Sequence, residues 1–143
     1  MEVTTHRSAF ASLQKAIREA FLYFRPPKDQ TVSEWAIQNR ILPKGTTSRP
    51  GPFRPEVFQV EMMNVILDPN VHEIVVMKST QVGYTDAVLN NAIGYYIDAD
   101  PKPMMLVYPT IDNAKDKGKK VITPMIDACP ALRGKIRSPT SRR

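Results

Sequence analysis

The sequence has one cysteine and no long hydrophobic run, which excludes an internal disulfide and a membrane-spanning segment in the residues given. A single cysteine, Cys129, excludes an internal disulfide and fits a reducing compartment. The apolar runs, such as residues 74–77, are far too short to cross a bilayer. The first residues carry no apolar block of the secretory type, so we expect no signal peptide there. We expect Cys129, within "DACPAL", to be a small buried residue rather than a nucleophile.

Acidic residues are also scarce in the last third of the chain. The formal net charge is +6, of which residues 101–143 contribute +7 and residues 1–100 contribute −1. This asymmetry suits a polyanionic partner such as nucleic acid, although a solvated basic face is the commoner reason for it. The candidate phosphate contacts share one expected helix; they are Lys115, Lys117, Lys119 and Lys120.

Hydrophobic spacing predicts three helices in the first half of the chain. Residues 8–24 have an amphipathic pattern, residues 31–42 begin with the T-x-x-E capping box of Thr31 and Glu34, and residues 56–67 form the third helix. Between them, residues 43–55 contain four prolines and two glycines, which predicts a segment without regular structure.

The second half has the pattern of a β-α-β-α unit. The short apolar runs at 72–77 and 104–109 are typical of strands buried on both faces, and residues 85–97 read as a helix between them. A further helix is expected at 110–128, weakened by Gly118 and kinked or broken at Pro124. A connection of this length predicts parallel pairing, so the expected fold class is α/β.

The turn between the first strand and its helix, "KSTQVGYT" at 78–85, has features of a phosphate-binding loop. Gly83 allows a tight turn, Thr85 supplies a hydroxyl at the helix start, and Lys78 supplies a cation. The usual P-loop has glycine at the position of Lys78 and lysine at the position of Tyr84. A flexible lysine tolerates such an exchange, because it acts as a point charge. The loop alone leaves a variant site, a degraded site and an incidental turn open.

The pattern K-S-x-x-V-G-Y-[ST] resembles the phosphate loop of the lambda-type (GpA-like) phage terminase large subunits. Further segments resemble that family in the same order along the chain, covering roughly residues 31–137. They are "SEWAIQNRIL" at 33–42, "RPGPF" at 49–53, "DPNVHEIVVMKSTQVGYT" at 68–85, "NNAIGYYIDADPKPMMLVYPTIDNAK" at 90–115 and "VITPMIDACPALRGKI" at 121–136.

The resemblance implies an incomplete P-loop NTPase core, with three α/β/α layers and a parallel sheet, preceded by two N-terminal helices. It implies an ATPase that drives viral DNA into a procapsid and that is linked to a nuclease, with ATP and Mg²⁺ as cofactors. Lys78, Gly83 and Thr85 would hold the triphosphate and Mg²⁺. Phe53 would stack on the base or, alternatively, pack its own loop, and Arg54 would touch phosphate. The remaining cradle residues are Ser79, Thr80, Gln81, Val82 and Tyr84.

The same resemblance divides the chain and implies its partners. Residues 1–48 would be a helical region and linker that contacts the small terminase subunit, residues 49–137 the N-terminal part of the ATPase domain, and residues 138–143 a disordered basic tail. Double-stranded viral DNA and the portal or procapsid are the other expected partners, in the host cytoplasm.

ATP hydrolysis needs a strand that ends in an acidic pair, and no apolar run of this sequence ends in one. The nearest acidic residues, Asp98 and Asp100, follow a helix and are expected to form a polar turn. We therefore expect no catalytic residue here, and neither ATPase nor nuclease activity from this chain alone. Two alternatives remain: a non-enzymatic DNA-binding or assembly module, and a fragment of a helicase-like ATPase.

Overall fold

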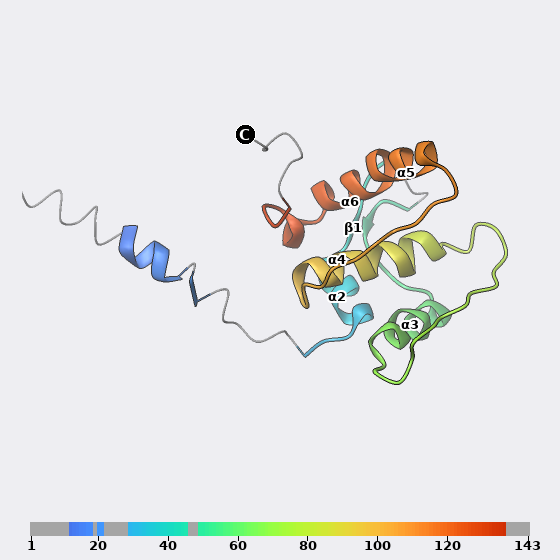
Figure 1. Ribbon diagram of the computed structural model, residues 1–143, viewed down its shortest axis with the longest axis horizontal. Coiled ribbons are helices and arrows are strands. Elements are labelled where there is room, and N and C mark those ends of the chain that lie inside the picture. Colours follow the sequence, from blue (N-terminus) through green and yellow to red (C-terminus); the bar gives the residue numbers. More distant parts are fainter. Residues whose placement is uncertain (1–11, 19, 22–28, 46–48, 137–143) are drawn as a thin grey trace, which may run out of the picture.

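The computed structural model describes residues 12–18, 20–21, 29–45 and 49–136, which are mainly helical (Figure 1). In chain order the elements are α2 (Val32–Asn39), β1 (Ile41–Leu42), β2 (Gly51–Pro52), α3 (Val57–Asn64), the 3-10 turn η1 (Val65–Leu67), the π-helical turn η2 (Thr85–Leu89), α4 (Asn90–Asp98), α5 (Ile111–Lys117), the π-helical turn η3 (Gly118–Ile122), α6 (Thr123–Ala128) and the 3-10 turn η4 (Pro130–Leu132). Residues 12–18 and 20–21 are helical, as predicted for 8–24. The other residues of that segment and the tail 138–143 lie outside the described part.

Helix α2 begins as its sequence predicts. The Glu34 amide donates to Thr31 Oγ1 at 3.3 Å, and the Thr31 amide donates to Glu34 Oε2 at 2.7 Å, which completes the capping box. The helix ends earlier than predicted, because Arg40 adopts an extended backbone.

The two strands lie where a helix end and an irregular segment were expected, so both expectations are wrong there. Ile41 pairs with Pro52 and Leu42 with Gly51, in an antiparallel ladder. Proline is tolerated because a two-stranded ladder leaves one side of each strand without a partner. The positive φ of Gly51, 122°, is one that glycine adopts without strain.

The predicted strands at 72–77 and 104–109 are absent from the structure, which corrects the parallel-sheet prediction for the described residues. Both runs lie in extended, irregular segments, and no backbone–backbone hydrogen bond of the described chain involves them. Their side chains are largely exposed; those of Val75, Met77 and Met105 are 83%, 100% and 84% accessible. A strand exists only where a partner satisfies its backbone groups, and apolar composition cannot supply that partner.

The two helical predictions of the second half are confirmed. Turn η2 and α4 form one continuous helical run over 85–98, and α5, η3 and α6 form another over 111–128. The expected break at Pro124 is absent. Instead the Thr123 amide donates to the Gly118 carbonyl, five residues back, and Pro124 lies in the first turn of α6, where its missing N–H is tolerated.

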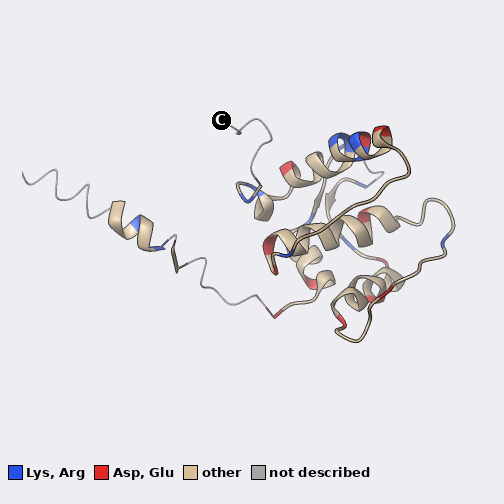
Figure 2. Ribbon diagram, in the orientation of Figure 1, with Lys and Arg blue, Asp and Glu red and all other residues tan. Residues whose placement is uncertain are grey.

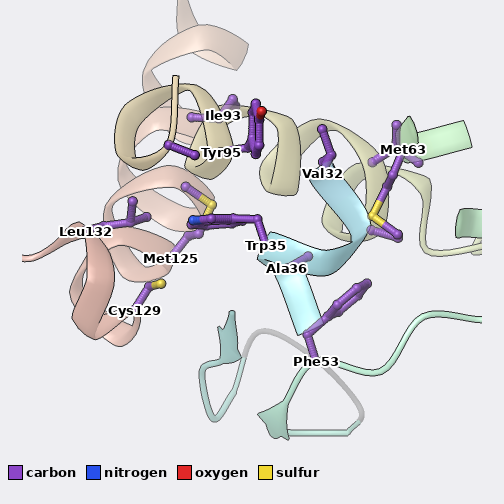
Figure 3. Close-up of a cluster of buried hydrophobic side chains, with 13 residues drawn as sticks. Val32, Trp35, Ala36, Phe53, Met63, Ile93, Tyr95, Met125, Cys129 and Leu132 are labelled. Atoms are coloured by element: carbon purple, nitrogen blue, oxygen red, sulfur yellow. The ribbon is translucent and has the colours of Figure 1, made fainter. Parts of the chain in front are cut away.

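The core forms around α2, which lies against α4 (Figure 3). Trp35 of α2 is fully buried, and its Nε1 donates to Asp98 Oδ2 at 2.7 Å. The Asp98 carboxylate also forms a salt bridge with the Lys135 ammonium, which links the segment after η4 to the end of α4. The other buried apolar residues are Val32, Ala36, Phe53, Met63, Ala87, Val88, Ile93, Tyr95, Ala99, Met125, Cys129 and Leu132.

Within its described residues, the molecule is thus a mixed helical fold with a small two-stranded sheet. In that same part of the chain, no helix has the length and apolar character needed to cross a membrane.

Candidate nucleotide-binding site

The loop 78–84 enters the helical run 85–98 through two left-handed residues. Gln81 and Gly83 have φ values of 62° and 73°, so the backbone turns sharply just before the helix. No side chain caps the start of η2. The first amide groups of a helix lack partners within it, and together with the helix dipole they favour an anion at this end.

Lys78 stays on the loop itself. Its side chain is exposed, and its Nζ donates to the Ser79 carbonyl at 3.4 Å. Lys78 is not among the residues that line either of the two cavities described below, and neither are Ser79, Thr80, Gln81, Val82 or Tyr84.

The larger of those cavities, about 570 Å³, has a volume typical of small-molecule sites. Four parts of the chain form its wall: β1, the segment around β2, helix α3, and Gly83 with the start of the 85–98 helical run. The lining residues are Leu42, Arg49, Pro50, Pro52, Phe53, Arg54, Pro55, Glu56, Gln59, Gly83, Asp86 and Ala87. Of the residues predicted from the sequence, the structure therefore brings Phe53, Arg54 and Gly83 together here. Phe53 is 5% exposed and also belongs to the core.

Gln59 is a residue of this wall that the sequence analysis missed. Its side chain is 7% exposed, its Oε1 accepts from the Glu56 amide at 3.0 Å, and its Nε2 donates to the Val82 carbonyl at 3.2 Å. The second bond joins α3 directly to the loop 78–84. The signal in the sequence was slight: an uncharged polar residue in the first turn of a largely apolar predicted helix.

A smaller cavity of about 200 Å³ shares Asp86 with the larger one. Its lining residues are Arg40, Pro43, Thr85, Asp86, Lys117 and Val121. Thr85, the predicted metal ligand, therefore lies with one of the predicted nucleic-acid lysines, Lys117. Arg40 was not singled out from the sequence, because an arginine at the end of a helix usually reaches solvent.

Arg40 is buried beside a carboxylate of the 85–98 helical run. Its guanidinium Nη1 donates to the Ile41 carbonyl at 2.7 Å, and its Nη2 lies 3.8 Å from Asp86 Oδ1. Burial lowers the pKa of Arg40, while the charge of Asp86 acts in the opposite direction. Arginine nevertheless keeps its proton in proteins, so Arg40 brings a positive charge to this wall.

The predicted nucleic-acid lysines lie on one continuous helical run, formed by α5 and η3. Lys115, Lys117, Lys119 and Lys120 are all exposed, on α5 and η3, where Figure 2 shows a group of basic residues. Lys120 pairs with Asp116 at 2.7 Å, four residues earlier on the same helical run.

The acidic residues considered in the sequence as a catalytic pair serve structural contacts. Asp98 accepts a hydrogen bond from the Trp35 indole and forms a salt bridge with Lys135. Asp100 forms a salt bridge with Lys102 at 2.5 Å. Among the described residues, no group of three or more histidine, cysteine, aspartate or glutamate side chains is placed to hold a metal ion.

The family to which this chain belongs follows from comparison with known proteins. The model of the phage terminase large subunit gpA ATPase domain matches residues 47–143. The chain belongs to this terminase family. It is 30% identical to the terminase large subunit of Enterobacteria phage P21 over 122 residues, and 31% identical to that of Escherichia phage lambda over 106 residues.

These alignments cover most of the chain and little of each relative. They include 85% and 74% of this chain, but 19% of the P21 terminase subunit and 16% of the lambda subunit. No solved structure matches the chain. The segment matched by the family model contains the loop 78–84, the start of the helical run 85–98 and the lysines of α5 and η3.

Proposed function

We propose that this terminase segment binds ATP through the loop 78–85, as part of a motor that packages viral DNA. One observation carries the proposal: the loop's left-handed turn at Gln81 and Gly83 leads into an uncapped helix start that borders a cavity of about 570 Å³. The family match supports the same use, since the matched model is that of an ATPase domain.

The residues present fit an adenine nucleotide. Phe53 and Gln59 offer an aromatic face and an amide for the base, and Arg49 and Arg54 offer charge to phosphates from the same wall. Ser79 to Tyr84 supply the backbone cradle, and the Thr85 hydroxyl is the available ligand for Mg²⁺. Mg²⁺ bound with the nucleotide would neutralise phosphate charge.

Lys78 has to move for this role. Its present hydrogen bond to the Ser79 carbonyl is long, and its ammonium is exposed, so little holds it in place. Rotation about its four-carbon stem would bring the charge towards phosphates at the helix start, which is the exchange of lysine position that the family resemblance implies.

The motor role, its partners and its location remain part of the proposal. Double-stranded DNA is the substrate that the motor moves into the procapsid through the portal, in the host cytoplasm. Residues 1–48 would contact the small terminase subunit. Their helix at 12–18 and 20–21 exposes Leu13, Ile17 and Phe21 at a spacing of four residues, which is an apolar stripe suited to a protein partner.

Calorimetric titration of the chain with MgATP tests nucleotide binding. We expect Lys78→Ala to weaken ATP at least tenfold, because it removes a charge-assisted phosphate contact. Lys115→Ala is the matched control: it removes an exposed lysine of α5 that lines neither cavity, and ATP affinity should be unchanged. Equal ATP affinity in the wild type and Lys78→Ala would rule out this lysine as the phosphate ligand.

A second candidate function, direct DNA binding by the basic helix, has its own observation. Lys115, Lys117 and Lys119 are exposed and form no salt bridge with a described residue. Replacing any lysine that contacts a DNA phosphate should reduce the salt dependence of duplex binding by about one unit of slope. Lys102→Ala, outside this helix, is the control. If the salt dependence of duplex binding is unchanged in the alanine variants of Lys115, Lys117 and Lys119, the helix does not bind DNA and its lysines only face solvent.

A further inference from the structure

We infer that the smaller cavity is an oxyanion pocket, in which Arg40, Lys117 and Thr85 hold a phosphate group. The oxyanion chemistry follows from the cavity itself. Its assignment to the terminal phosphates of a nucleotide rests on the proposed function.

Arg40 is a buried cation with too few partners. It is 2% exposed, and among the described residues its side chain makes one hydrogen bond, from Nη1 to the Ile41 carbonyl. Its Nε has no hydrogen-bond partner in the described part of the chain, and the 3.8 Å between Nη2 and Asp86 Oδ1 is too long for a hydrogen bond. A buried guanidinium with most of its donors unused is costly, and such groups usually have a partner. A phosphate is the partner that the planar guanidinium fits best.

The rest of the wall has the chemistry that an oxyanion requires. Lys117 reaches the cavity from α5 and forms no salt bridge with a described residue. Thr85 contributes from the uncapped start of the continuous helical run 85–98, whose dipole favours negative charge there. Two cations and a helix start thus surround a space of about 200 Å³, which admits a phosphate group.

Asp86 is the opposing charge in the wall. Its Oδ1 accepts from Asn90 Nδ2 at 2.8 Å and faces Arg40. Its carboxylate repels an incoming anion, and Arg40 offsets that repulsion. Asp86→Asn retains an oxygen for the Asn90 contact and removes the charge, so this variant should bind an oxyanion more tightly than the wild type.

Two sources present this chemistry: the terminal phosphates of a nucleotide and the backbone of DNA. The nucleotide is favoured because Asp86 lines both cavities, and Thr85 follows the phosphate loop directly. A ligand that enters the larger cavity could therefore extend its phosphates past the helix start into the smaller one. DNA is the other source, since Lys117 belongs to the basic helix.

The test of the pocket is calorimetric titration of the chain with sodium pyrophosphate at low ionic strength. We expect the folded wild type to bind pyrophosphate, Lys117→Ala to weaken it about tenfold, and Arg40→Gln to weaken it at least as much, with partial recovery in Arg40→Lys. Lys119→Ala is the matched control, because Lys119 is exposed on the same helical run but lines neither cavity. Circular dichroism establishes that each variant is folded. If Arg40→Gln unfolds, the pocket is tested by the expected weaker pyrophosphate binding of Lys117→Ala and the expected tighter binding of Asp86→Asn.

Two results would overturn the pocket: no pyrophosphate binding by the folded wild type, or equal losses in Lys117→Ala and Lys119→Ala, which would mean a diffuse charge effect. Titrations with ATP, AMP and duplex DNA then identify the source. A loss in Lys117→Ala that is larger for ATP than for AMP supports the nucleotide, whereas a loss for DNA with ATP unchanged overturns that assignment in favour of the DNA backbone. Pyrophosphate binding without any nucleotide binding would keep the pocket and refute the proposed ATP function.

Discussion

Gly94 of α4 lies against the indole ring of Trp35 of α2, so closely that a Cβ at position 94 would overlap the ring. The same tryptophan donates to Asp98, one turn further along α4. Because the helical run that contains α4 starts directly after the loop 78–84, these contacts fix that helical run to the N-terminal half of the core. The position of the candidate site therefore depends on this helix pair.

Replacing Gly94 by alanine should destabilise the fold. Alanine favours a helix over glycine by about 1 kcal/mol, but the overlap with Trp35 forces a shift of packed groups. Overpacking of this kind costs about 1–3 kcal/mol, so we expect a net loss in the free energy of unfolding, measured by urea denaturation with circular dichroism. Gly118→Ala is the control: it lies in a helical run with nothing within 4 Å, and it should be neutral or slightly stabilising. If the free energy of unfolding of Gly94→Ala equals that of the wild type, Gly94 does not lie as close to the Trp35 ring as the structure shows.

Replacing Gln59 by leucine should loosen the phosphate loop from α3. The Val82 carbonyl and the Glu56 amide both lose their side-chain partner, and the free energy of unfolding should fall by about 1–3 kcal/mol. Hydrogen exchange of loop 78–84 should also become faster, and ATP affinity should fall with it. Val57→Ala, on the same helix but 90% exposed, should change none of these three quantities. If hydrogen exchange of residues 78–84 is as slow in Gln59→Leu as in the wild type, Gln59 does not stabilise the loop.

The Cys129 thiol should be inert in the folded chain. It is fully buried, its Sγ donates to the Asn39 carbonyl at 2.9 Å, and burial raises its pKa above the ordinary value of 9.0. Reaction with a thiol reagent at pH 8 should therefore follow global unfolding and accelerate steeply in urea. Rapid labelling in native buffer, with circular dichroism unchanged, would show that the thiol is accessible.

The raised pKa of Cys129 also gives stability a definite dependence on pH. The folded state holds the thiol proton more tightly than the unfolded state, so its contribution is complete below pH 9 and is lost as the pH rises through the raised folded pKa. Between pH 8 and 10, the unfolding free energy of Cys129→Ala should change less steeply than that of the wild type. Parallel pH profiles would refute this contribution.

The 143-residue chain should release no phosphate from ATP, with or without DNA. No acidic pair follows an apolar strand in its sequence, and the nearest acidic residues, Asp98 and Asp100, are occupied by Trp35, Lys135 and Lys102. Without a group to orient the attacking water, bound phosphates are not hydrolysed efficiently. A coupled phosphate-release assay with MgATP measures this directly. Turnover that vanishes in Lys78→Ala would show that catalytic carboxylates are present in this chain.

Local signals in the sequence were sufficient for local structure. The reciprocal hydrogen bonds of Thr31 and Glu34, and the helices that follow residue 84 and residue 110, arise from residues close together in the chain. The exposed lysines of α5 and η3 were also predictable, because a run of charged residues on one helix rarely lies in a core.

Contacts between distant segments were not predictable in this way. The link from Gln59 to Val82 and the approach of Arg40 to Asp86 depend on how α2, α3 and the 85–98 helical run pack, which no short pattern records. The apolar run at 72–77 failed as a strand for a related reason: its composition is suited to a sheet, but a strand also needs a neighbour along its whole length.

The irregular segments 71–79 and 101–109 have a consequence for proteolysis. Each presents an extended, largely exposed backbone with few or no main-chain hydrogen bonds, which is the form that a protease cleft must bind. Lys78 offers a cleavage point to trypsin-like enzymes in the first segment, and Leu106 offers one to chymotrypsin-like enzymes in the second. Cleavage in both segments would cut the chain on either side of the helix that carries Gly94. That helix would then be held in the molecule by its packing against Trp35 rather than by covalent connection.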